Sequence, residues 1–244
     1  MAPTPNVAAC LSFALAAPAL AQVGSPFTQL IDDFSQGAFS RTSSWTSPGA
    51  QLDQPGLNTL GGRRVSSLAM LPPNASYGSQ IAGTMSVDTS GSGTLNFSEA
   101  SFAIPTSVVS FGYRAAALGA ISSMMANLNF PGTHGVAIDF LSLSAPTFVQ
   151  IELATIVPGQ SGRAVWQGTI DPAAGNQPFR FRTTWSQYAF DPNFTLSQVD
   201  QIFILIRPVP GSSASIGAVG ISPSPSAAAL LGLAACTAAR RRRS

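Results

Sequence analysis

Short apolar runs separated by glycine and proline make up most of the chain. Residues 147–157 alternate regularly, so that Val149 and Ile151 fall on one face of an extended chain while Gln150 and Glu152 fall on the other. Such alternation is typical of a β-strand with one buried and one solvent-facing side. The apolar runs between glycine and proline breaks predict seven strands, at residues 81–87, 107–113, 134–143, 147–157, 164–170, 178–184 and 199–207.

The breaks between these runs carry turn-forming residues such as Pro158-Gly159. Residues 199–207 are nearly all apolar, which indicates a strand buried on both faces. The best alternative for a helix is residues 115–125, but Gly119 weakens it. Strands spaced roughly ten residues apart predict an all-β fold, a two-sheet antiparallel β-sandwich of jelly-roll type.

The N-terminus has the pattern of a secretion signal. Residues 7–20 are mostly Ala, Leu and Val, and Ala19 and Ala21 supply the small residues of a cleavage site before Gln22. We therefore predict a signal peptide at residues 1–21, with an N-terminal signal helix. The Sec translocon and signal peptidase are then expected partners, and the body, residues 22–221, lies outside the cytoplasm.

The last residues, 222–244, differ in pattern from the body. A mostly apolar run of thirteen residues at 227–239 follows a Pro-Ser-Pro motif and precedes four arginines. As a helix this run would be about 20 Å long, against a hydrocarbon core of about 30 Å. Arginines can snorkel and a bilayer can thin, which reduces the difference. We predict a C-terminal transmembrane helix whose arginines stay on the cytoplasmic side.

This tail resembles the PEP-CTERM sorting signal of exported bacterial proteins. In that family a Pro-Glu-Pro motif precedes a transmembrane segment and a basic cluster. Pro223 and Pro225 match the prolines, and Ser224 stands where the family usually has glutamate. The basic cluster is matched by Arg240, Arg241, Arg242 and Arg243. The resemblance implies processing by an exosortase, and a protein associated with the cell surface or with extracellular polysaccharide.

The charge of the chain lies mainly in this tail. The formal net charge of +2 includes the four tail arginines, which leaves eight basic residues against ten acidic ones in the body. A slightly acidic body argues against nucleic acid as a partner. Cys10 and Cys236 lie in the signal and the tail, so the body has no disulfide and no thiolate metal site. Its fold must depend on its apolar core.

A second resemblance concerns the body. Residues 31–34 read Ile-Asp-Asp-Phe, and residues 199–202 read Val-Asp-Gln-Ile after a Phe-Thr pair at 194–195 and an aromatic residue at Trp185. This arrangement is similar to the frame of galactose-binding-like jelly rolls, a group that includes many carbohydrate-binding modules. The resemblance implies a jelly-roll body and a polysaccharide partner.

Flat aromatic rings would serve such a partner, because the C–H face of a sugar is apolar. Trp45 lies among serines and threonines in a loop-like stretch, and Trp185 and Tyr188 flank a Ser-Gln pair. These three are the candidate sugar-binding residues, and core packing is the alternative role for each. Trp166 lies within an alternating run and is expected to be structural.

Acidic residues at the start of the body are candidate calcium ligands. Asp32 and Asp33 could supply oxygen atoms to a calcium ion. The alternative is an aspartate that caps a turn in solvent. Calcium is the one cofactor considered, and otherwise none is expected.

The pair Arg63-Arg64 follows two glycines, which predicts a turn with solvated charge.

Catalytic patterns are weak. His134 is the one histidine, and Asp139, five positions later, would point to the opposite face of the same strand. A serine–histidine–aspartate triad therefore does not form locally. Glu99 and Glu152 are further carboxylates with no pattern to select them. We expect a non-enzymatic exported protein of the cell surface or extracellular matrix, with two alternatives: a carbohydrate-binding module of the cell surface, and a secreted hydrolase.

Overall fold

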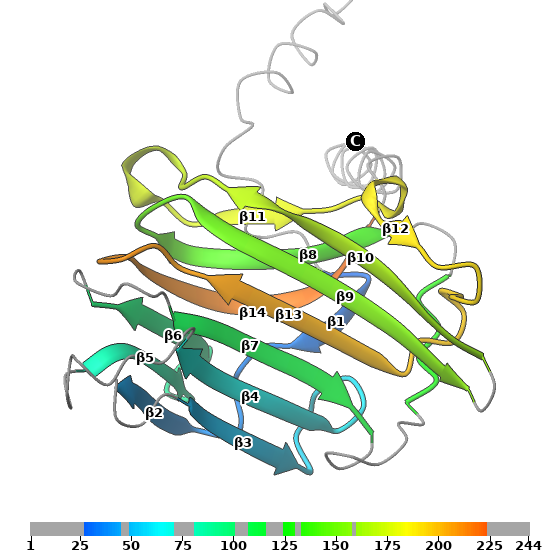
Figure 1. Ribbon diagram of the computed structural model, residues 1–244, viewed down its shortest axis with the longest axis horizontal. Helices are drawn as coiled ribbons and strands as arrows, with labels where there is room; N and C mark the ends of the chain where they lie inside the picture. The colour runs from blue at the N-terminus through cyan, green and yellow to red at the C-terminus, as the bar shows by residue number, and fades with distance from the viewer. Residues whose placement is uncertain are drawn as a thin grey trace, which may run out of the picture.

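The computed structural model describes residues 27–44, 49–70, 81–100, 107–115, 124–129, 133–157 and 160–223. Within these ranges the chain forms two antiparallel β-sheets that pack face to face (Figure 1). Sheet 1 contains, in spatial order, β11 (Phe179–Arg182), β8 (Thr133–Leu143), β14 (Ser213–Pro223), β6 (Thr94–Glu99), β5 (Ile81–Asp88) and β2 (Phe39–Ser44), with β1 (Gln29–Asp32) paired to β14. Sheet 2 contains β12 (Ala189–Phe190), β10 (Gln160–Ile170), β9 (Thr147–Val157), β13 (Gln201–Arg207), β7 (Ser107–Arg114), β4 (Arg63–Met70) and β3 (Gly49–Pro55).

The connectivity is jelly-roll-like, because the chain passes repeatedly from one sheet to the other. β2 leads to β3, β4 to β5, β6 to β7 and β8 to β9, and each of these steps changes sheet. The four longest strands, β8, β9, β10 and β14, have eleven residues each. The expected fold class, an all-β antiparallel sandwich, is confirmed for the described part of the chain.

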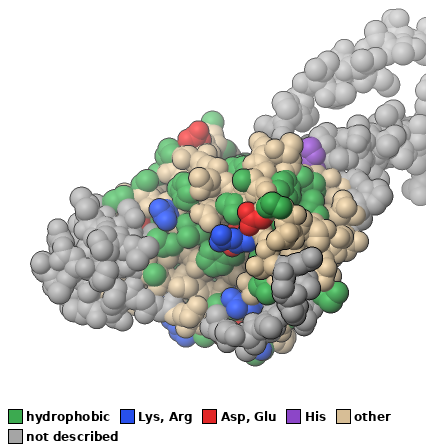
Figure 2. Space-filling model, turned by 45° about the vertical axis from the view of Figure 1, so that its right-hand side comes forward, with side chains coloured by type: hydrophobic (Ala, Val, Ile, Leu, Met, Phe, Trp, Pro, Cys, Tyr) green, Lys and Arg blue, Asp and Glu red, His purple; other side chains and the backbone are tan. Residues whose placement is uncertain are grey.

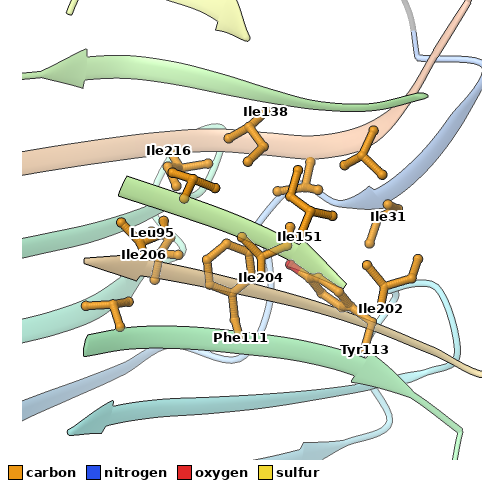
Figure 3. Packing of buried hydrophobic residues seen from close by; sticks show 14 of the residues in the cluster. Ile31, Leu95, Phe111, Tyr113, Ile138, Ile151, Ile202, Ile204, Ile206 and Ile216 are labelled. Carbon is orange, nitrogen blue, oxygen red and sulfur yellow. The ribbon is translucent and has the colours of Figure 1, made fainter. Parts of the chain in front are cut away.

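The core lies between the two sheets, where alternate side chains of each strand point inward. On β13, Ile202, Ile204 and Ile206 are completely buried. Figure 3 shows them beside Phe111 and Tyr113 of β7, whose rings meet edge to face at a centroid distance of 6.1 Å. With no disulfide available in the body, burial of these side chains is the main favourable term in folding.

The alternation predicted for residues 147–157 is confirmed in full, because β9 spans the same residues. The other six predicted strands are also present, with ends shifted by a few residues. Seven strands were missed, namely β1, β2, β3, β4, β6, β12 and β14. β6 illustrates why: Leu95 and Phe97 point into the core between Thr94, Asn96 and Ser98, so only two apolar residues mark the strand.

Two local predictions were wrong. The apolar run 199–207 is buried on one face only, since Phe203 and Leu205 of β13 are half-buried on the outward side. The arginine pair was predicted to lie in a solvated turn, but Arg63 and Arg64 begin β4 and Arg64 is 1% exposed. β14 also extends to Pro223, so the first two residues of the expected tail belong to sheet 1.

Several predicted features lie outside the described residues. These are the signal peptide with Ala19, Ala21 and Gln22, the candidate Trp45, and the tail from Ser224 through Pro225 to Arg240, Arg241, Arg242 and Arg243. In the part of the chain that is described, no helix has the length and apolar character needed to cross a membrane.

Candidate functional site

The outward face of sheet 2 brings aromatic, amide and charged side chains together in rows across the strands. Each row follows from strand register, because residues paired across neighbouring strands point to the same face. The first row runs from β10 to β4 through Val165, Glu152, Phe203, Gly112 and Val65.

Phe203 is the centre of this row. A Cβ atom added to Gly112 would lie 3.4 Å from a carbon of the Phe203 ring, so the ring covers the position where a larger side chain would stand. Beyond the glycine, Val65 is only 6% exposed although it points outward. On the other side of Phe203 stands Glu152, whose side chain is 23% exposed. Its Oε1 atom lies 3.7 Å from Nη1 of Arg163.

The second row consists mainly of uncharged groups. It runs through Gln167, Gln150, Leu205 and Ser110. Gln167 is exposed and Gln150 is half-buried on the neighbouring strand. Each amide offers two N–H donors and an acceptor oxygen, so the pair can bond to neighbouring hydroxyl groups.

The third row contains the second aromatic ring of this face. Phe148 of β9 pairs with Thr169 of β10 and with Arg207 of β13. The guanidinium carbon of Arg207 lies 5.4 Å from the centroid of the Phe148 ring, which is within the range of a cation–π contact. The ring and the guanidinium together form a half-buried surface with N–H donors at its exposed edge.

The three rows form one continuous surface, which we call the sheet 2 face. Phe148 and Glu152 are four residues apart on β9, which places the first and third rows about 13 Å apart along the strands. Figure 2 presents hydrophobic, basic and acidic side chains in small intermingled groups. An extended molecule lying along the strands would meet a ring, then amides, then a second ring.

The sequence-predicted sugar-binding residues lie elsewhere. Trp185 and Tyr188 lie on the connection between β11 and β12, with ring centroids 5.5 Å apart. Tyr188 is 5% exposed and its hydroxyl lies 3.0 Å from Oγ1 of Thr183. Burial raises the pKa of this phenol above its ordinary value. Tyr188 therefore has a core-packing role, and Trp185 is half-buried.

The two candidate calcium ligands, Asp32 and Asp33, accept hydrogen bonds from different partners. Asp32 Oδ1 accepts the backbone N–H of Phe34 at 2.8 Å, and Oδ2 accepts Nη1 of Arg64 at 2.8 Å. Burial raises the pKa of the Asp32 carboxyl, and the charge of Arg64 opposes this effect. Asp33 instead accepts two hydrogen bonds from Ser35. Among the described residues, no three histidine, cysteine, aspartate or glutamate side chains gather as a metal site.

Two of the carboxylates considered for hydrolysis, Asp139 and Glu152, do not form a pair. Asp139 points outward from sheet 1, because its neighbours Ile138 and Phe140 belong to the core. Its two oxygens accept Nε and Nη2 of Arg180 at 2.5 and 2.7 Å. Glu152 points outward from sheet 2, so the whole sandwich separates it from Asp139.

The residues of the sheet 2 face were only partly anticipated. Alternation in residues 147–157 had placed Gln150 and Glu152 on a polar side. Phe203 and Arg207 were missed, because the apolar run containing Phe203 was interpreted as buried on both sides. The pairing of this run with β9 would have indicated its outward side, because β9 carries Gln150 and Glu152 on one face.

No protein-family model matches the chain, and no curated protein matches it. Among solved structures, the chain is similar to a family 11 carbohydrate-binding module from Clostridium thermocellum in complex with a β-1,3-1,4-mixed-linked tetrasaccharide. The identity is 8% and the TM-score 0.42, over 80% of this chain and 95% of the module.

A second structure of such a module, from a cellulosomal cellulase of the same organism, gives 10% identity and a TM-score of 0.39 over 82% and 97% of the two chains. A family 12 xyloglucanase from Bacillus licheniformis gives 10% identity and a TM-score of 0.33 over 71% and 100%.

Proposed function

We propose that this protein is an exported, non-catalytic polysaccharide-binding protein, and that the sheet 2 face is its binding surface. The observation that carries the proposal is the spacing of the rows: the Phe203 ring and the Phe148–Arg207 pair lie about 13 Å apart along the strands, with Gln150 and Gln167 between them.

The chemistry of this face suits an extended neutral glycan. A pyranose ring presents apolar C–H groups that pack on an aromatic ring, and hydroxyl groups at its edge that bond to amides and carboxylates. Phe203 supplies the apolar contact, while Gln150 and Glu152 supply polar ones on the neighbouring strand. Both signs of charge occur on the face, which does not favour a highly charged polymer.

Affinity electrophoresis in gels containing soluble linear polysaccharides tests this function. The panel comprises mixed-linkage β-glucan, xyloglucan, xylan and hydroxyethylcellulose. We expect at least one polymer to slow the protein, and the double variant Gln150→Ala/Gln167→Ala to abolish most of the retardation. Thr42→Ala is the matched control, because Thr42 is exposed on the outward side of sheet 1. Retardation by none of the polymers, or equal retardation of both variants, would contradict the proposal.

We further propose that the two ends of the chain direct this body out of the cell and retain it at the surface. The signal-peptide pattern at residues 1–21 and the apolar and basic tail at 224–244 support this proposal. Processing by an exosortase-type enzyme would remove the tail. Intact-mass spectrometry of protein recovered from the producing cell tests this step, since the expected mass lacks residues 1–21 and the tail. A full-length mass would contradict it.

A further inference from the structure

A chain of aromatic rings lies at one end of the sandwich, outside the sheet 2 face, and it runs from the edge of the core to the surface. Trp185, Tyr188, Phe190 and Phe194 contact one another in sequence, with centroid distances of 5.5, 6.3 and 5.6 Å. Tyr188 forms the buried base, Trp185 and Phe194 are half-buried, and Phe190 is 46% exposed. We call these four residues the aromatic ridge.

The described chain ends beside this ridge. Pro223, the last residue of β14, pairs with Thr133 of β8. The indole Nε1 of Trp185 lies 3.5 Å from the Oγ1 atom of the same Thr133. The described chain therefore ends opposite the same residue that Trp185 of the ridge contacts.

The N-terminal segment leaves at the same place. β1 pairs with the last part of β14, with Gln29 opposite Ile221, and the N–H of Thr28 donates to the carbonyl of Ile221 at 2.8 Å. Both segments that carry apolar runs in the sequence, residues 7–20 and 227–239, thus connect to neighbouring strands at one end of the body.

The short stretch of chain between Pro223 and the apolar run limits how far the ridge can lie from a membrane that holds this run. The apolar run begins at residue 227, only four residues after Pro223, and four extended residues reach at most about 14 Å. If the run enters a bilayer, the end of the sandwich that carries the ridge must lie close to the headgroups. Aromatic side chains with one apolar and one polar end concentrate at that depth of a membrane.

From this juxtaposition we infer that the aromatic ridge is a lipid-docking surface, with Trp185 and Phe190 placed in the interface of the membrane that holds the tail. This inference rests on the proposed insertion of the tail in a membrane, and it applies to the chain before the tail is removed. Docking would fix the orientation of the body, because the ridge adds a second contact next to the anchor.

The test uses the full chain with phosphatidylcholine vesicles that contain lipids brominated in the acyl chain, which quench nearby tryptophans. We expect the protein to float with the vesicles and to be quenched, and Trp185→Phe to reduce the quenching at least twofold. Trp166→Phe is the matched control, because Trp166 packs against Phe181 at 5.0 Å and should leave the quenching unchanged. Phe190→Ser should lower the quenching of Trp185 roughly fivefold at limiting lipid.

The possible results separate the two ideas. A protein that does not float with vesicles overturns both the retention of the tail and the docking of the ridge. A protein that floats but is quenched equally with and without Trp185 retains the anchor and overturns the docking. Complete protection of Trp185 from aqueous iodide in the absence of lipid, beyond the half-burial of its ring in the body, would mean that the tail or a second copy covers the ridge, and this also overturns the inference.

Discussion

Nη1 of Arg64 lies 2.8 Å from Oδ2 of Asp32, and the two side chains are 1% and 2% exposed. The same guanidinium donates hydrogen bonds to the carbonyls of Gln36 and Gly37 and to Oε1 of Gln54. One buried cation thus joins β4 to β1, to the segment after β1 and to β3. Sheet 2 therefore helps to hold β1, the first strand in the chain, in its place in sheet 1.

Replacing Arg64 with Met should lower the free energy of unfolding by about 3–5 kcal/mol, because Asp32 would remain buried without its charge partner. Urea denaturation measures the change. Arg63→Met is the matched control: Arg63 pairs with Asp53 at the same 2.8 Å, but the two side chains are 19% and 23% exposed, so the expected cost is about 0–1 kcal/mol. Equal costs for the two variants would rule out the linking role of Arg64.

Acid should weaken the turn that follows β5. Asp88 Oδ1 accepts the backbone N–H of Ser90 at 2.8 Å, which lowers the pKa of Asp88 below its ordinary value of 3.8. A lowered pKa in the folded state contributes stability above pH 3.8 that is lost as the pH falls through the folded-state pKa. Urea denaturation between pH 5 and 2 should therefore show a smaller acid loss in Asp88→Asn than in the wild type. Parallel pH profiles would contradict this assignment.

A methyl group at Gly162 should destabilise the protein. A Cβ atom there would overlap the backbone nitrogen of Phe194 and lie 2.5 Å from the carbonyl carbon of Asn193. Gly162→Ala should therefore cost about 1–3 kcal/mol, through displacement of this segment from β10. Gly112→Ala is the control on another strand of sheet 2, with its nearest contact at 3.4 Å, and should change stability by less than about 1 kcal/mol. Thermal denaturation by circular dichroism compares them.

Truncation of the chain after Pro223 should leave the fold stable, whereas truncation within β14 should destabilise it. A chain ending at Pro223 keeps Ile221, which is completely buried and pairs with both β1 and β8, and it keeps Ser222 bonded to Gly135. A chain ending at Val219 loses these contacts and should lose about 2–5 kcal/mol for the isoleucine alone. The far-UV spectrum and Tm measure the difference. A loss of β signal in the chain ending at Pro223 would show that the tail is part of the core.

The sequence predicted individual strands best where apolar residues recur at every second position over many residues. β9 was predicted with its exact bounds, because its eleven residues alternate almost without interruption. β6 and β2 were missed, because short strands facing solvent with serine, threonine and asparagine contain too few apolar residues for a period to emerge. Tyr188 was predicted as a site candidate and is buried, since burial depends on neighbours that are distant in the sequence.

The amino-acid sequence by itself determined the all-β class, the lack of disulfides in the body and the distinct character of the two chain ends, because period, composition and apolar run length are local properties. Only the tertiary structure decided which residues from distant parts of the chain lie next to one another. Phe203 lies between Glu152 and Gly112, and Arg64 reaches Asp32, through pairing and packing of strands that are 32 to 91 residues apart in the chain. Registers of this kind depend on how the whole sandwich buries its inner faces, and no short segment of the chain carries that information.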